Sequence, residues 1–223
     1  MQNNPVKIAI AGVGTVGGGV LEILQKKFFL KKINLNLTAI ASRRKIKLNK
    51  DVYKNTIIFK DARELLKFDN YDILLETIGG EEGIAKELVF SAIKKGKNVV
   101  TANKALISKY WNELQNLSKN NSCIIKYEAA VAGGIPIIKI LDEFLTSNSI
   151  KRIYGILNGT SNFIITNMQK KNESFDNILK KAQDLGYAES NPKFDIDGTD
   201  TAQKLSILSS LSFGIDSNIK KIY

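Results

Sequence analysis

The chain has 223 residues, a formal net charge of +11, 43% hydrophobic residues and one cysteine. This length accommodates one large domain or two small ones, and a single cysteine excludes an internal disulfide. The sequence has no signal-peptide pattern and no apolar run long enough to cross a bilayer, so we expect a cytoplasmic protein without a membrane partner. Because the lysines are scattered in pairs rather than gathered in an arginine-rich block, we interpret the charge as surface charge and do not expect nucleic-acid binding.

The chain begins with a predicted strand, a glycine-rich turn and a predicted helix. Residues 6–11 (VKIAIA) form an apolar run typical of a buried strand, and residues 16–27 have helical apolar spacing. The G-x-G-x-x-G sequence between them allows a tight turn, close approach of a pyrophosphate and close helix packing. A purely structural glycine turn is the alternative. We predict a dinucleotide site that contains Gly12, Val13, Gly14, Thr15, Val16 and Gly17.

The end of the second predicted strand, residues 35–41, contains the residues expected to select the cofactor. NAD sites usually place an Asp or Glu there, which accepts a hydrogen bond from the ribose 2′-hydroxyl. This chain has Arg43 and Arg44 instead, and its next acid is Asp51. Because guanidinium groups bind a 2′-phosphate, the sequence favours NADP(H), although NAD(H) remains possible. A basic loop without this role is the alternative.

Short apolar strands and helices continue to alternate along the first part of the chain. Strands are predicted at 56–59, 71–76, 98–100 and 124–127, and helices at 61–67, 81–95, 108–119 and 136–145. This alternation predicts an α/β fold with a Rossmann-type doubly wound parallel sheet. The carboxyl ends of parallel strands face the ligand crevice, which would place Thr77 and Lys104 near cofactor or substrate. An ordinary surface lysine is the alternative for Lys104.

A second part of the chain follows residues 147–149. We expect a strand at 151–157, a polar turn at 158–162 that enters a helix, and a helix at 174–185. Residues 186–204 (GYAESNPKFDIDGTDTAQK) then bring together four acids and a lysine in the order Glu189, Asp195, Asp197, Asp200 and Lys204. The last two are four residues apart in a helical pattern, so both project from one helix face. Such acids can hold a substrate amine and such a lysine can transfer a proton, whereas a solvated ion pair is the alternative.

Five segments, in this order, resemble the homoserine dehydrogenase family. They are GVGTVG at 12–17, TANKAL at 101–106, YEAAVAGGIPII at 127–138, GILNGTSNFI at 155–164, and residues 186–204. The resemblance implies NAD(P)-dependent interconversion of L-aspartate 4-semialdehyde and L-homoserine, on the route to threonine, methionine and isoleucine. It also implies a nucleotide-binding domain at 1–130, an α+β substrate-binding and dimerisation domain at 131–223, and a homodimer.

The resemblance further implies roles for individual residues. Lys204 corresponds to the proton donor to the aldehyde oxygen, and Lys104 to a second lysine that contacts both substrate and nicotinamide. The implied substrate contacts are Glu189, Asp195, Asp200, Tyr187, Gly159 and Thr160. An implied structural sodium site, built mainly from backbone carbonyls, consists of Glu128, Val131, Gly133 and Ile135. Asp197 receives no role.

The sequence departs from the family pattern in length. Family chains normally continue well past the position of Tyr223, so we expect a substrate domain that is incomplete at its C-terminus. Two alternatives to a homoserine dehydrogenase therefore stay open. One is a different NADP-dependent oxidoreductase, and the other is a truncated, non-catalytic homologue that binds nucleotide or pairs with another chain.

Overall fold

The computed structural model describes residues 4–26, 34–48, 53–171, 173–189 and 191–222. Lys27, the predicted end of the first helix, and Asp51 lie outside the described residues. The chain divides into two compact units, Met1–Pro136 and Ile137–Tyr223. Each unit has its own cluster of buried hydrophobic side chains. Within the described ranges, no helix combines the length and the hydropathy needed to cross a membrane.

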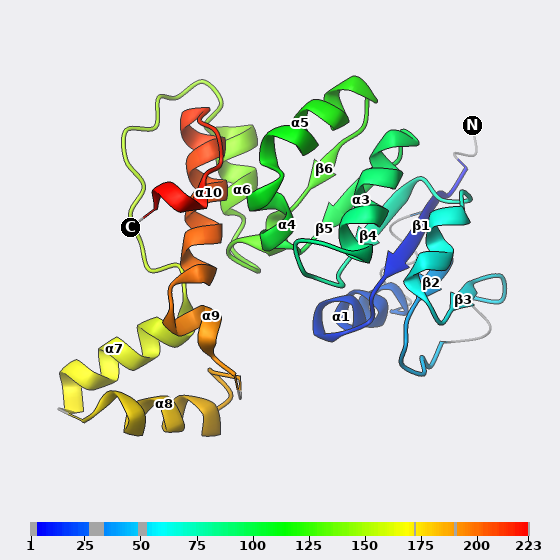
Figure 1. Ribbon diagram of the computed structural model, residues 1–223. Helices are drawn as coiled ribbons and strands as arrows, with labels where there is room; N and C mark the ends of the chain where they lie inside the picture. Colours follow the sequence, from blue (N-terminus) through cyan, green and yellow to red (C-terminus); the bar gives the residue numbers. More distant parts are fainter. Residues whose placement is uncertain (1–3, 27–33, 49–52, 172, 190, 223) are drawn as a thin grey trace. The chain divides into compact units, whose positions relative to one another are not determined.

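Within its described residues, the first unit contains a six-stranded sheet in the order β3-β2-β1-β4-β5-β6 (Figure 1). The strands are β1 (Val6–Ala11), β2 (Leu35–Ala41), β3 (Ile57–Phe59), β4 (Ile73–Glu76), β5 (Asn98–Thr101) and β6 (Ile125–Lys126). Every pairing between them is parallel. The chain winds outward from the central β1–β4 pair in both directions, which confirms the predicted doubly wound α/β fold.

The helices of the first unit connect these strands. They are α1 (Thr15–Leu24), the 3₁₀ helix η1 (Ala62–Lys67), α3 (Ile84–Lys94), α4 (Lys104–Lys109), α5 (Trp111–Asn120) and the 3₁₀ turn η2 (Glu128–Ala130). The single helix predicted at 108–119 is wrong, because two helices meet at Tyr110, whose φ of −111° and ψ of 25° are not helical. The Tyr110 ring contacts the Phe90 ring edge to face, and its hydroxyl bonds to Glu82 and Lys86, so tertiary contacts determine the break.

The helix α1 is held against the centre of the sheet by a buried apolar cluster. Leu21 and Leu24 of α1 pack against Ile10 of β1 and Ile40 of β2, and Tyr53 closes the cluster. The Tyr53 hydroxyl donates to the Leu24 carbonyl at 2.6 Å, which satisfies a carbonyl at the end of the helix. Burying each large side chain contributes about 1.5–3 kcal/mol to the stability of the fold. The cluster therefore anchors α1 to the sheet.

The described residues of the second unit form helices and loops. The helices are α6 (Ile137–Lys139), the π-helix η3 (Ile140–Phe144), α7 (Gly159–Lys171), α8 (Phe175–Asp184), α9 (Lys193–Ile196), α10 (Thr199–Phe213) and the 3₁₀ turn η4 (Ile219–Lys221). The strand predicted at 151–157 is wrong: these residues have no regular secondary structure. Tyr154 and Ile156 are 89% and 72% exposed. A strand needs a hydrogen-bonded neighbour, and the described residues of this unit supply none.

Candidate active site

The glycine-rich turn after β1 is packed tightly at two glycines and open at the third. A Cβ on Gly17 would lie 2.1 Å from the Gly12 carbonyl oxygen and 2.5 Å from Thr77 Oγ1. Gly12 has a φ of +97°, and its carbonyl accepts a hydrogen bond from the Thr77 hydroxyl at 2.7 Å. A Cβ on Gly14, by contrast, would meet nothing within 4 Å. No side chain caps the N-terminus of α1, so this open space adjoins helix N–H groups that can bind an anion.

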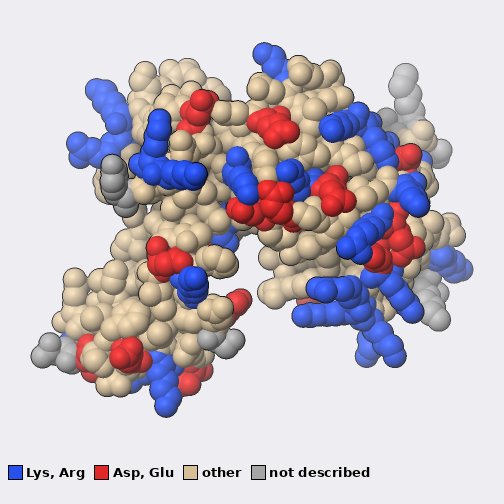
Figure 2. Space-filling model, viewed as in Figure 1, with Lys and Arg blue, Asp and Glu red and all other residues tan. Residues whose placement is uncertain are grey.

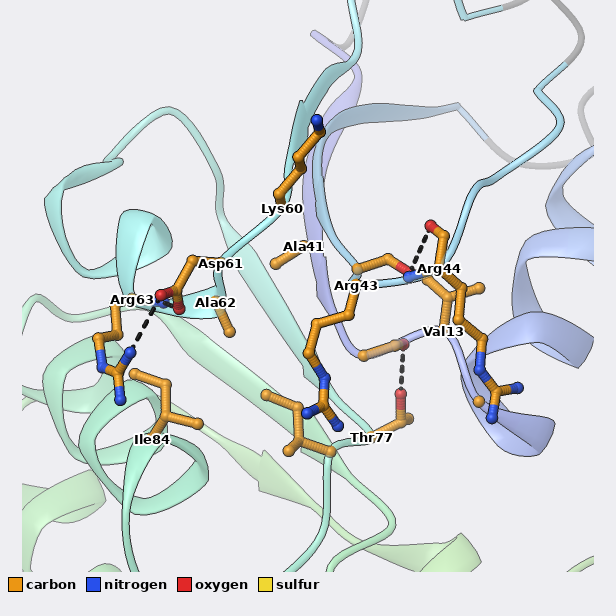
Figure 3. A pocket seen from close by; sticks show the side chains of 14 residues that line it. Val13, Ala41, Arg43, Arg44, Lys60, Asp61, Ala62, Arg63, Thr77 and Ile84 are labelled. Carbon is orange, nitrogen blue, oxygen red and sulfur yellow. Dashed lines mark hydrogen bonds and ion pairs between the residues drawn. The ribbon is translucent and has the colours of Figure 1, made fainter.

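A pocket of about 570 Å³ opens at this turn (Figure 3). Its lining residues come from the turn after β1 and the ends of β2, β3 and β4. They include the predicted cofactor residues Gly12, Val13, Gly14, Arg43, Arg44 and Thr77. The other predicted residues of the motif, Thr15, Val16 and Gly17, form the first turn of α1 next to the pocket. The structure therefore brings the glycine turn and the arginine-bearing loop together at one cavity.

The pocket rim is predominantly cationic. The charged residues among the described lining are four cations, Arg43, Arg44, Lys60 and Arg63, and one acid, Asp61. The acid is already engaged, because Asp61 pairs with the Arg63 guanidinium at 3.0 Å and caps η1. The hydrogen bond from the Arg63 N–H, with help from the Arg63 guanidinium, lowers the pKa of the Asp61 carboxyl.

The two arginines after β2 are exposed and extend in different directions. In Figure 3, Arg43 extends toward the Thr77 side of the pocket, whereas Arg44 extends toward α1. The Ser42 hydroxyl bonds to both the N–H and the carbonyl of Arg44 at 3.1 Å, which orders this loop. Elsewhere on the visible face, basic side chains are interleaved with acidic ones (Figure 2).

A fully buried carboxylate joins the ends of the neighbouring strands β4 and β5. Glu76 accepts hydrogen bonds through Oε1 from the N–H groups of Ile78 (2.8 Å) and Gly79 (3.0 Å). Its Oε2 accepts from the Thr101 hydroxyl at 2.5 Å. Three donors stabilise the carboxylate in this water-free position. The loop after β4, which lines the pocket, is thereby tied to the end of β5.

The same network continues to the start of α4. The Thr101 hydroxyl accepts from the Asn103 N–H at 2.9 Å, and the Asn103 side chain caps α4 through the Leu106 N–H at 3.1 Å. The Asn103 side-chain amide also donates to the Gly80 carbonyl at 2.6 Å. Lys104 is half-buried. Because it is the first residue of α4 and follows the cap Asn103, its backbone position depends on this capped turn.

In the second unit, the predicted lysine–aspartate pair forms on α10. The Lys204 ammonium lies 2.7 Å from Asp200 Oδ2, and the two side chains are 17% and 8% exposed. The ammonium also donates to the Leu157 carbonyl at 2.9 Å. The Asn158 side-chain amide donates to Asp200 Oδ2 at 2.9 Å and to Asp195 Oδ1 at 2.7 Å. These residues are called the lysine–acid cluster below: Leu157, Asn158, Asp195, Asp200 and Lys204.

The other residues with implied substrate contacts lie around the start of α7 and after α8. Gly159 begins α7, and the Thr160 hydroxyl donates to the Tyr187 carbonyl at 2.6 Å. The Tyr187 ring stacks on Phe163 with centroids 4.7 Å apart. Glu189 is exposed, and among the described residues no contact joins its carboxylate to the lysine–acid cluster.

Asp197, which received no role, stabilises the turn before α10. The Thr199 N–H donates to Asp197 Oδ1 at 2.9 Å. Hydrogen bonds from the hydroxyl and the N–H of Thr199 lower the pKa of this carboxyl. The side chain therefore serves the start of the helix that carries Asp200 and Lys204.

The residues implied for a sodium site lie in a run of tight backbone turns after β6. The Val131 N–H bonds to the Glu128 carbonyl at 3.4 Å, and the Ile135 N–H bonds to the Ala132 carbonyl at 3.1 Å. Gly133 has a φ of +59°, a conformation that favours glycine. Backbone carbonyl oxygens are ligands that a hard cation prefers.

Three residues with a clear part in this geometry were missed from the sequence: Glu76, Asn103 and Asn158. Asn103 and Asn158 stand directly before helices, which is a recognisable N-cap position. That signal predicts the hydrogen bond that each side-chain oxygen accepts as a cap, but not the hydrogen bonds that each side-chain nitrogen donates. The partners of the Asn158 amide lie 37 and 42 residues further along the chain.

Comparisons with known proteins match both units to one family. A family model described as homoserine dehydrogenase, NAD binding domain, matches residues 12–128, and one described as homoserine dehydrogenase matches residues 136–223. The homoserine dehydrogenase of Neisseria gonorrhoeae is 43% identical over 225 residues, which cover 98% of this chain and 51% of that protein. The enzyme of Bacillus subtilis is 36% identical over 226 residues, with 97% and 51% covered.

Solved structures agree with these sequence matches. The crystal structure of a homoserine dehydrogenase from Thiobacillus denitrificans is 42% identical, with a TM-score of 0.86 over 98% of this chain and 51% of that one. A hyperthermophilic archaeal homoserine dehydrogenase in complex with NADPH is 30% identical, with a TM-score of 0.82 over 98% and 75%. The chain spans about half the length of the Neisseria gonorrhoeae and Bacillus subtilis enzymes. It belongs to the homoserine dehydrogenase family and carries that family's nicotinamide-nucleotide-binding domain.

Proposed function

We propose that the chain catalyses the NADP-dependent interconversion of L-aspartate 4-semialdehyde and L-homoserine. The observation that carries this proposal is the partly buried Lys204–Asp200 pair at 2.7 Å, in a chain that also has the glycine-turn pocket. The reaction belongs to the biosynthesis of threonine, methionine and isoleucine. The protein works as a homodimer in the cytoplasm.

The pocket of the first unit binds the cofactor, which supplies or accepts the hydride. The open space at Gly14 and the uncapped N–H groups of α1 receive the pyrophosphate. Arg43 and Arg44 receive the 2′-phosphate, and the pairing of Asp61 with Arg63 reduces the repulsion that a free carboxylate would add. The cationic rim therefore supports NADP(H) over NAD(H). One similar structure, the archaeal enzyme, contains NADPH.

The lysine–acid cluster carries the substrate chemistry. A lysine ammonium has three N–H donors, and Lys204 directs two of them to Asp200 Oδ2 and the Leu157 carbonyl. The third is available to protonate the aldehyde oxygen as the hydride arrives at carbon. Glu189 and Asp200 hold the substrate amine, and Asp195 is a further acid near the substrate. Further substrate contacts come from Tyr187, Gly159 and Thr160.

The proposal also assigns roles to two elements of the first unit. Lys104, the first residue of α4, is the second lysine that the family resemblance implies, with a positive charge that would stabilise an oxyanion on the substrate. Oxygen atoms of Glu128, Val131, Gly133 and Ile135 hold a structural sodium ion. The support for this part of the proposal is that hard cations prefer oxygen ligands.

The test compares Lys204→Ala with Lys180→Ala, which removes an exposed lysine from α8 of the same unit. NADP⁺ reduction is measured with L-homoserine in excess, and NADPH affinity is measured by fluorescence titration. We expect turnover by the wild-type chain and by Lys180→Ala, and none by Lys204→Ala, with similar NADPH affinities in all three. Bound NADPH without turnover in the wild-type chain would overturn the proposal in favour of a non-catalytic nucleotide-binding homologue.

A further inference from the structure

Asn158 uses both ends of its side-chain amide, and the nitrogen end bonds within the lysine–acid cluster. It is 5% exposed and stands directly before α7. Its Oδ1 accepts from the Ser161 N–H at 2.7 Å, and its Nδ2 donates to Asp195 at 2.7 Å and Asp200 at 2.9 Å. A backbone N–H needs an acceptor and ionised carboxylates need donors, so the orientation of the amide follows from its partners.

The position of this amide links the acids to the lysine. Two carboxylates converge on Nδ2, and a neutral donor between them offsets their mutual repulsion. The Asp200 oxygen that accepts from Asn158 is the same Oδ2 that accepts from Lys204. The Lys204 ammonium also donates to the carbonyl of Leu157, the residue immediately before Asn158. Residues 157 and 158 therefore contact both members of the ion pair.

We propose that Asn158 is a positioning residue for the reaction of this site, an inference that rests on the proposed function. Its amide holds the Asp200 carboxylate in one orientation, and this carboxylate in turn directs the Lys204 ammonium. It also holds the Asp195 carboxylate beside that of Asp200, because both accept from the same Nδ2. Asn158 itself transfers no proton.

A purely structural role as a helix cap makes a different prediction. Only Oδ1 takes part in the cap, and Ser and Asp are caps of similar strength to Asn. Asn158→Ser and Asn158→Asp therefore keep an oxygen for the Ser161 N–H but lose the two bonds from Nδ2. Asn158→Asp also places a third carboxylate beside Asp195 and Asp200. A cap role predicts wild-type behaviour for both variants, whereas a positioning role predicts damage that is greater in Asn158→Asp.

The first experiment measures how readily the Lys204 amine reacts with a labelling reagent, and it does not require turnover. An amine-reactive ester labels the protein, and mass spectrometry gives the labelling rate of Lys204 relative to the exposed Lys180. We expect Asn158→Ser to raise this ratio about threefold or more, because a hydrogen bond to a charged group is lost. The matched control is Asn167→Ser, which removes the 2.8 Å bond from that amide to the Phe163 carbonyl and should leave the ratio unchanged.

The second experiment measures steady-state kinetics and melting of the same variants. We expect Asn158→Ser to lower kcat about tenfold or more with the KM for NADPH close to wild type, and to lower the melting temperature because buried hydrogen bonds to Asp195 and Asp200 are lost. An unchanged Lys204 labelling ratio, or increased labelling with unchanged kcat, would overturn the positioning role. An inactive wild-type chain would refute the proposed function. The labelling ratio would then still decide whether Asn158 holds the lysine.

Discussion

The glycine turn allows a paired test that separates folding from cofactor binding. Gly17→Ala would place a Cβ 2.1 Å from the Gly12 carbonyl oxygen, against an ordinary contact distance of at least 3.4 Å. The turn would have to open by about 1.3 Å, the difference between these two distances. Gly14→Ala, three residues earlier, places its Cβ in open space and meets nothing within 4 Å. Its φ of −83° is negative, but its ψ of −148° lies outside the regions that alanine favours.

The expected magnitudes follow from these contacts. The strain at Gly17 is against rigid backbone, so the upper part of the usual range, about 3 kcal/mol, applies. Replacing a helical glycine by alanine returns about 1 kcal/mol, which leaves a net loss of about 2 kcal/mol. For a protein of this size, that lowers the melting temperature by about 4–8 °C. Gly14→Ala meets no atom, so only its backbone conformation opposes it, at a cost of about 1 kcal/mol.

NADPH provides the second readout. At a concentration of about 100 times Kd, bound NADPH stabilises the wild-type chain by about 2.7 kcal/mol. If a Cβ at Gly14 obstructs the pyrophosphate and weakens binding about a hundredfold, the same concentration contributes only about 0.4 kcal/mol. Thermal melts of both variants, with and without NADPH, measure both effects. A Gly14→Ala chain that keeps the full NADPH stabilisation, or a Gly17→Ala chain that melts like wild type, would refute this reasoning.

Three further substitutions test other parts of the site. Lys204→Ala should abolish turnover and leave NADPH affinity near wild type, as checked by kinetics and titration, and a large loss of cofactor affinity would contradict its role. Arg43→Ala should weaken NADPH about tenfold and NADH much less, because one charged contact to the 2′-phosphate is lost, and equal losses would refute that contact. Thr101→Val should destabilise the protein to urea by about 2 kcal/mol, because Glu76 and the Asn103 N–H each lose a buried partner. Thr101→Ser keeps the hydroxyl and should restore most of this stability.

Local sequence patterns were sufficient to predict the parts of the fold whose causes are local. The strands β1 and β2 have the predicted bounds, Val6–Ala11 and Leu35–Ala41, because buried parallel strands read as continuous apolar runs. The spacing of Asp200 and Lys204 was also informative, since a separation of four residues brings two side chains together on any helix.

The features that the sequence did not reveal depend on distant partners. Tyr110 interrupts a helical pattern because its hydroxyl bonds to Glu82 and Lys86, which precede it by 28 and 24 residues. Residues 151–157 have apolar residues typical of a strand, but a strand forms only when another strand pairs with it. The cap position of Asn158 was readable, whereas its bonds to two acids required the fold of the whole second unit.

The most direct test of the central claim follows the hydride itself. The 223-residue chain is incubated with L-aspartate 4-semialdehyde and NADPH that carries deuterium at the transferable position, and mass spectrometry examines the product. We expect L-homoserine with one deuterium on the carbinol carbon, formed by the wild-type chain and not by Lys204→Ala. Unchanged aldehyde in the presence of tightly bound NADPH would contradict the claim that this chain is a homoserine dehydrogenase in activity as well as in family.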